Sequence, residues 1–133
     1  MRRQVFLTVA LAIGVGSCMP GAGGGGGGFF QGPQYASGQQ IYNTLTNFSV
    51  VGAMANGTSY CEYHAPSGQL QGRAAQPYQG TWQVNGNQIC YNSPQSGQVN
   101  NCQNVLFEGQ RASFFTPGGQ PVASGNLIGG NVC

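Results

Sequence analysis

The segment from Thr81 to Tyr91 constrains the fold more than any other part of this chain. An Asn-Gly pair at positions 85–86 separates two stretches in which apolar or aromatic side chains alternate with polar ones. Asn-Gly tolerates the positive φ angles of a two-residue type I′ turn, so the segment predicts a β-hairpin with Trp82 opposite Ile89. The apolar side chains then share one face and the glutamines the other, as in a half-buried antiparallel hairpin.

The rest of the chain after residue 46 repeats this pattern of short strands and tight turns. Further strands are predicted at 48–51, 59–64, 69–73, 104–107 and 111–115, with a last one through 126–128.

Residues 63–69 and 114–120 match each other at a constant offset of 51: each is an aromatic strand end, a turn with Pro and Gly, and a return strand. This match predicts two similar hairpins. Seven or eight such strands predict a mostly β fold, a small antiparallel meander that forms a curled sheet or barrel.

One short N-terminal helix is expected over residues 37–45. Ser37 is a suitable N-cap, and Gln40 stands three residues later, as in a capping box. Ile41 and Leu45 form an apolar pair at i, i+4 spacing.

Four cysteines follow the first one, Cys18, and they permit three pairings. We favour Cys90–Cys102, which closes a short loop, and Cys61–Cys133, which fastens the carboxyl end. A zinc site is the alternative for these cysteines. It is disfavoured because the chain has no CxxC pair and a single histidine, so we expect no metal and no other cofactor.

The amino-terminal residues have the pattern of a secretory signal. Arg2 and Arg3 precede a short apolar run that ends in small residues before Cys18. Val15-Gly16-Ser17-Cys18 resembles the bacterial lipobox, which implies cleavage before Cys18 and a lipid anchor on its sulfur. The alternative is an ordinary signal peptide cut nearby. By the same resemblance, Met19 after the cysteine is not a signal for retention in the inner membrane. We therefore expect an exported envelope protein anchored at the outer membrane.

Charged residues are scarce, and this excludes one class of partner. The whole chain has four arginines or lysines and two acidic residues. Two of the basic residues lie in the predicted signal, which leaves Arg73 and Arg111 to face Glu62 and Glu108. Nucleic-acid binding depends on many basic contacts to phosphate, so no nucleic-acid partner is expected.

Three regions are therefore expected: a signal peptide over 1–17, a Gly-rich tether over 18–37, and a disulfide-bonded β domain over 38–133. The tether contains the glycine run 23–28, which has neither the strand nor the GK[ST] motif of a phosphate loop.

Glu62 and His64 are the residues that come closest to a catalytic pattern. They stand two apart on a predicted strand and should share a face with Tyr60. We favour a solvated pair on a polar face over an acid–base pair, and we expect no catalytic residue. Glu108 and Arg111 flank a turn and are expected to pair at the surface.

Several of these features together resemble a group of small exported proteins of Gram-negative bacteria, similar to the DUF995 type. The shared features are the short helix, Gly80-Thr81-Trp82, Ile89-Cys90-Tyr91 and the second cysteine at Cys102. The likeness covers about residues 38–128. It implies a mostly β domain with a Cys90–Cys102 link and implies no activity.

The sequence therefore predicts a non-enzymatic envelope lipoprotein with a small β domain for binding or structural support. Its expected partners are the membrane, through Cys18, and an envelope protein or glycan. The alternative is an inhibitor of lysozyme or another hydrolase. Inhibitors usually present a protruding loop, and the candidate binding loop lies between the paired cysteines. It comprises Ser93, Pro94, Gln95, Ser96, Gly97 and Gln98.

Overall fold

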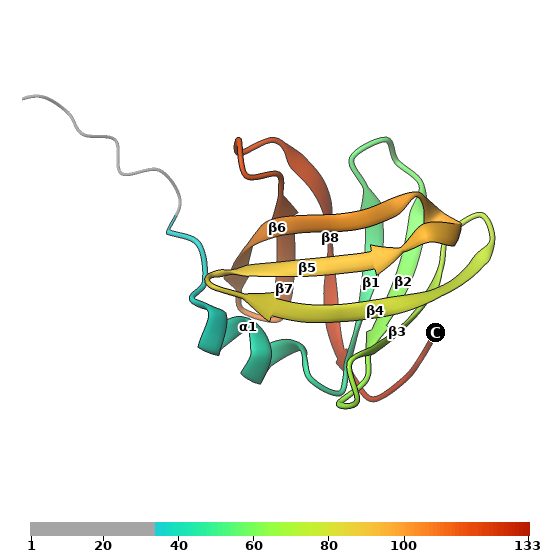
Figure 1. Ribbon diagram of the computed structural model, residues 1–133, viewed down its shortest axis with the longest axis horizontal. Coiled ribbons are helices and arrows are strands. Elements are labelled where there is room, and N and C mark those ends of the chain that lie inside the picture. The colour runs from blue at the N-terminus through green and yellow to red at the C-terminus, as the bar shows by residue number, and fades with distance from the viewer. Residues whose placement is uncertain (1–33) are drawn as a thin grey trace, which may run out of the picture. The chain divides into compact units, whose positions relative to one another are not determined.

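Eight antiparallel strands close into a barrel in the computed structural model, which describes residues 34–133 (Figure 1). Each strand pairs with its sequence neighbours, and β1 also pairs with β8. One helix, α1 (Gly38–Leu45), precedes the barrel. The strands are β1 (Phe48–Met54), β2 (Ser59–His64), β3 (Gln69–Arg73), β4 (Pro77–Asn85), β5 (Gln88–Ser93), β6 (Gln98–Glu108), β7 (Arg111–Phe115) and β8 (Pro121–Gly129). The predicted mostly β meander with one short helix is confirmed.

The β4–β5 hairpin forms as predicted, but its register differs. Trp82 pairs with Tyr91, and Asn85 pairs with Gln88. The turn therefore consists of Gly86 and Asn87, and Gly86 adopts the left-handed conformation with φ of 59°. The predicted pairing of Trp82 with Ile89 is wrong. The predicted faces are still correct, because the register differs by two residues and side chains alternate with a period of two.

The two hairpins predicted from the internal match have the same hydrogen-bond pattern at their turns. In the first, the Ala65 amide donates to the Gln69 carbonyl, and in the second the Thr116 amide donates to that of Gln120. Gly68 and Gly119, related by the same offset, both have φ of 89°. The turns therefore depend on glycine at the matching position.

Helix α1 covers one end of the barrel, beside the β4–β5 turn (Figure 1). The capping box of Ser37 and Gln40 is present, and Ile41 and Leu45 are fully buried. Gly38 permits this close packing, because a Cβ there would overlap the Gly86 carbonyl oxygen. We call the opposite end, with loops 55–58, 74–76 and 94–97, the distal end.

Both favoured disulfides are present. Cys90 lies directly opposite Cys102 in the β5–β6 pairing and is bonded to it. Cys61 on β2 is bonded to Cys133, and the Asn131 side chain donates to Gln71 Oε1 at 2.8 Å. The carboxyl end is therefore fastened to the outside of the barrel.

The last residues of the expected tether already contact the barrel. The Ala36 amide donates to the Val105 carbonyl at 2.7 Å, and the Tyr35 ring lies 5.5 Å from that of Phe115. The predicted signal peptide, the glycine run and Cys18 lie outside the described residues. Within residues 34–133 no helix has the length and apolar character needed to span a membrane.

Candidate functional site

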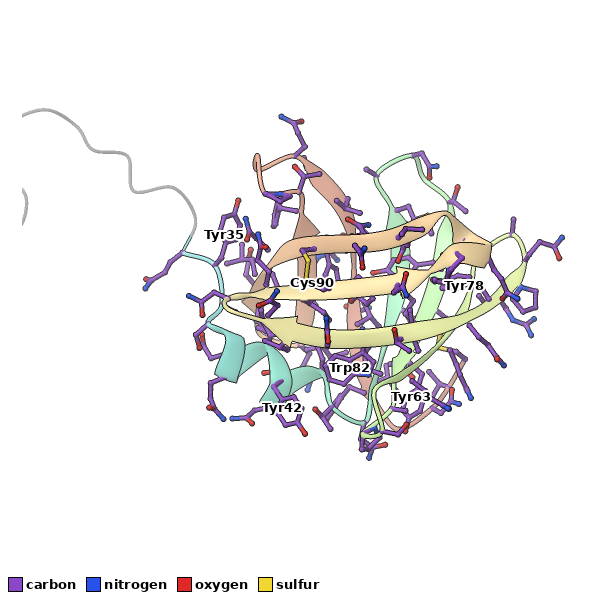
Figure 2. All side chains as sticks on the ribbon, viewed as in Figure 1. Tyr35, Tyr42, Tyr63, Tyr78, Trp82 and Cys90 are labelled. Carbon is purple, nitrogen blue, oxygen red and sulfur yellow. A yellow bond between two sulfur atoms is a disulfide. The ribbon has the colours of Figure 1, made fainter. Side chains whose placement is uncertain are left out.

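The interior of the barrel contains both apolar and polar side chains. Figure 2 shows Trp82 on the side of α1 and Tyr78 toward the other end of β4. The interior near α1 is filled by aliphatic side chains that include Leu70, Ile89 and Val105. Polar groups are buried in the same interior on Tyr60, Glu62, His64, Tyr78, Tyr91 and Gln103.

Glu62 lies inside the barrel rather than on its surface. Its side chain is 7% exposed, and its Oε2 atom has no hydrogen-bond partner. Burial raises the pKa of Glu62 to about 7, and the nearby Tyr78 hydroxyl offsets part of that rise. The predicted shared face of Tyr60, Glu62 and His64 is correct, but the predicted solvated Glu–His pair is wrong, because this face points inward.

Gly72 makes room for the Tyr78 side chain beside Glu62. It lies between these two residues in the register, pairing with Glu62 on β2 and with Tyr78 on β4. A Cβ at Gly72 would overlap the Tyr78 ring. A glycine within β3 thus lets the tyrosine cover the position that a side chain would otherwise fill.

His64 is fully buried, and both of its ring nitrogens are occupied. Nδ1 lies 3.3 Å from the Phe48 carbonyl oxygen, which can only accept, so Nδ1 carries the proton. Nε2 then accepts a hydrogen bond from the Tyr91 hydroxyl at 2.9 Å. Burial lowers the pKa of His64 to about 4, so the ring is neutral at pH 7. Its edge-on contact with the Trp82 ring, at 5.3 Å, completes its packing.

Two more tyrosine hydroxyls, those of Tyr60 and Tyr78, are buried without a partner. Burial, together with the negative charge of Glu62, raises the pKa of both above the ordinary value. Both hydroxyls are therefore protonated at neutral pH and can donate as well as accept. A buried polar group without a partner costs about 1–3 kcal/mol, so these groups favour an occupant that pairs with them.

A cavity of about 60 Å³ is lined by Tyr60 and Glu62, whereas Tyr78 lines a neighbouring, more open hollow. On the same measure of cavity volume, one water molecule needs about 10–15 Å³. The cavity therefore has room for a few waters or for the end of a ligand. Three of its lining residues have an unpartnered oxygen: Tyr60, Glu62 and Gln98. The cavity is lined by Met54, Tyr60, Glu62, Tyr91, Gln98, Gln103, Phe114, Val122 and Ala123.

The predicted binding loop borders this cavity. Ser93 is buried and donates to the Gln79 carbonyl at 2.8 Å, and Pro94–Ser96 form a turn of 3₁₀ helix. Gln98 lines the cavity and also a second, more open hollow of about 290 Å³, which Gln95 lines as well. Gln98, at the end of the loop, is therefore shared by the buried cavity and the open hollow.

The other predicted pair does not form as expected. Arg111 lies opposite Glu108 in the β6–β7 pairing, but its guanidinium donates to Ser124 Oγ at 2.7 Å. Within residues 34–133 no group of three or more His, Cys, Asp or Glu side chains could hold a metal ion.

Three site residues were not singled out from the sequence: Tyr78, Gln103 and Gly72. The isolated glycine within a strand was the one available signal, because such a glycine marks a close approach of another group.

Comparison of the chain with protein-family models, with curated proteins and with solved structures gives no match.

Proposed function

We propose that this chain is an exported, lipid-anchored binding protein of the cell envelope, without catalytic activity, whose ligand enters the distal end of the barrel. The observation that carries the proposal is the convergence of unpartnered polar groups of Tyr60, Glu62 and Gln98 on one cavity. Eight-stranded barrels have an interior wide enough for side chains or one small ligand, and the mouths of barrels are common ligand sites.

Two features support export. The disulfides Cys61–Cys133 and Cys90–Cys102 are typical of oxidising compartments. The signal-like residues before Cys18 supply a route out of the cytoplasm and a site for the lipid. Mass spectrometry of the native protein tests this part: acylated Cys18 at the amino terminus supports it, and an intact signal segment contradicts it.

The state of His64 supports a binding role over a catalytic one. A general base needs a free nitrogen near the substrate, whereas both nitrogens of His64 are engaged and the ring is inaccessible to solvent. The residue therefore stabilises the barrel interior.

Photo-cross-linking in intact envelopes tests where the ligand enters. Photoreactive benzoylphenylalanine replaces Gln95 at the distal end or, as the control, Gln83 on the exposed face of β4. We expect adducts from position 95 and none from position 83. Equal yields at both positions, or no adduct at either, would contradict a distal-end site.

An inhibitor of a hydrolase is the second candidate, and the shape of the loop favours it. Residues 94–97 are all exposed, and the Cys90–Cys102 disulfide braces the strands that carry them. Inhibition of lysozyme or a protease that is lost when residues 94–97 are replaced would support this candidate. No inhibition at micromolar protein would count against it.

A further inference from the structure

The cavity at the distal end holds one acidic group and no basic side chain. The other charged side chains of residues 34–133 are Arg73, Glu108 and Arg111, and all three are exposed. The remaining titratable groups around Glu62 are His64 and the three tyrosines Tyr60, Tyr78 and Tyr91, and all of these are neutral at pH 7. The negative charge of Glu62 therefore has no counter-ion within the barrel.

The unpartnered atoms around the cavity are all oxygens. Gln98 Oε1 is an acceptor and cannot donate. Ionised Glu62 likewise offers only acceptor oxygens, and the Tyr60 hydroxyl oxygen can accept as well. An alkylammonium group has three N–H donors and no acceptor, which complements this set. A neutral hydroxyl offers a single donor and would leave the others unpaired.

The walls of the cavity also suit a small cation. Tyr60, Tyr91 and Phe114 contribute aromatic rings, and rings attract a cation that lies over their faces. The volume of about 60 Å³ admits an ammonium group with a short alkyl stem and excludes a bulky ring. The remaining chain would extend into the neighbouring hollow between loops 74–76 and 94–97.

We propose that the cavity binds a primary alkylammonium group at the end of an unbranched chain, with the Glu62 carboxylate as its counter-ion. This inference rests on the proposed binding function and names the chemistry of its ligand. Such an end group occurs both on small free amines and on lysine side chains.

Chemical-shift titration of the lipid-bearing full-length chain in detergent tests the proposal. The probes are n-butylammonium chloride, Nα-acetyl-lysine amide, 1-butanol as the neutral analogue and potassium chloride as the salt control. We expect saturable shifts of the Tyr60 and Phe114 rings with at least one of the amines and none with butanol or salt. Saturation by butylammonium alone identifies a small free amine, and saturation by the lysine derivative identifies a lysine-bearing ligand.

The two glutamic acids give a matched pair of variants. Glu62→Gln should weaken amine binding by about tenfold or more, because a charge-assisted hydrogen bond contributes about 1.5–3 kcal/mol. Glu108→Gln removes the exposed acid and should leave the affinity unchanged.

The pH dependence of the unmodified chain keeps the proposal testable if Glu62→Gln fails to fold. Only ionised Glu62 pairs with ammonium, so with a pKa of about 7 the affinity should fall about tenfold from pH 8 to pH 6. Absence of saturable shifts, equal binding of butanol, or an affinity independent of both pH and Glu62 would overturn the proposal. Distal cross-links that persist in any of those cases would show that the proposed function stands with a different ligand.

Discussion

Replacing Glu62 by Gln should change the pH dependence of the free energy of unfolding in a defined direction. In the folded chain the pKa of Glu62 is about 7, against an ordinary value of 4.5. Between these values the folded state binds more protons than the unfolded state at this site. The Glu62 contribution to stability is therefore fully present below pH 4.5 and is lost as the pH rises to 7.

The magnitude follows from the same two pKa values. Their difference corresponds to about 3 kcal/mol, an order-of-magnitude figure for a side chain that is almost fully buried. Gln has nearly the same size and cannot ionise, so the variant lacks this term. Relative to the unmodified chain, Glu62→Gln should gain about 3 kcal/mol in stability between pH 4.5 and pH 8.

His64 contributes a term of opposite sign. Its pKa is lowered from 6.5 to about 4, so the unfolded state binds more protons and stability falls as the pH drops through this range. The two terms nearly cancel between pH 4.5 and pH 6.5, and the unmodified chain should show a flat profile there. The Glu62→Gln variant should lose stability on acidification across the same range.

Urea unfolding with both disulfides intact, followed by the fluorescence of the single tryptophan, Trp82, measures these differences. Glu108→Gln is the control, and its profile should run parallel to that of the unmodified chain. If the stability difference between Glu62→Gln and the unmodified chain did not vary with pH, Glu62 would not be a buried, unpaired acid.

Two further substitutions test the packing around the site. Gly72→Ala should lower the free energy of unfolding in urea by about 1–3 kcal/mol, since the added methyl overlaps the Tyr78 ring. Gly118→Ala is the control and should change the free energy of unfolding little, because its Cβ would meet only Thr116 Oγ1, at an ordinary contact distance of 3.8 Å. Tyr91→Phe should cost about 1–3 kcal/mol by leaving His64 Nε2 without its donor; unchanged stability in urea would show that this hydrogen bond is absent.

The local signals in the sequence account for most of the fold. The Ser37–Gln40 capping box and the turn glycines at 86, 68 and 119 each fix a short segment of backbone, and all lie where the sequence places a helix end or a hairpin. The exact pairing in the β4–β5 hairpin was missed because Asn85-Gly86 and Gly86-Asn87 both suit a two-residue turn.

The candidate site was harder to predict, because its polar residues come from strands far apart in the sequence. Both faces of β2 contain polar and aromatic side chains, so alternation alone does not show which face is inside. From the sequence alone, the face with Cys61 and Tyr63 is as suitable for the interior as the face with Glu62. The disulfide from Cys61 to Cys133 places the cysteine face outside. The approach of Tyr78 to Glu62 depends on Gly72, whose position between them follows only from the strand register.

The most direct test of this account is an NMR titration of the glutamate side-chain carboxyl carbons in the full-length chain. The chain has only two acidic residues, so Glu108→Gln assigns both resonances. We predict a midpoint near pH 7 for Glu62, as expected for an unpaired carboxyl group inside the barrel. A midpoint near 4.5 would show a solvated or paired carboxylate and would contradict the proposed site.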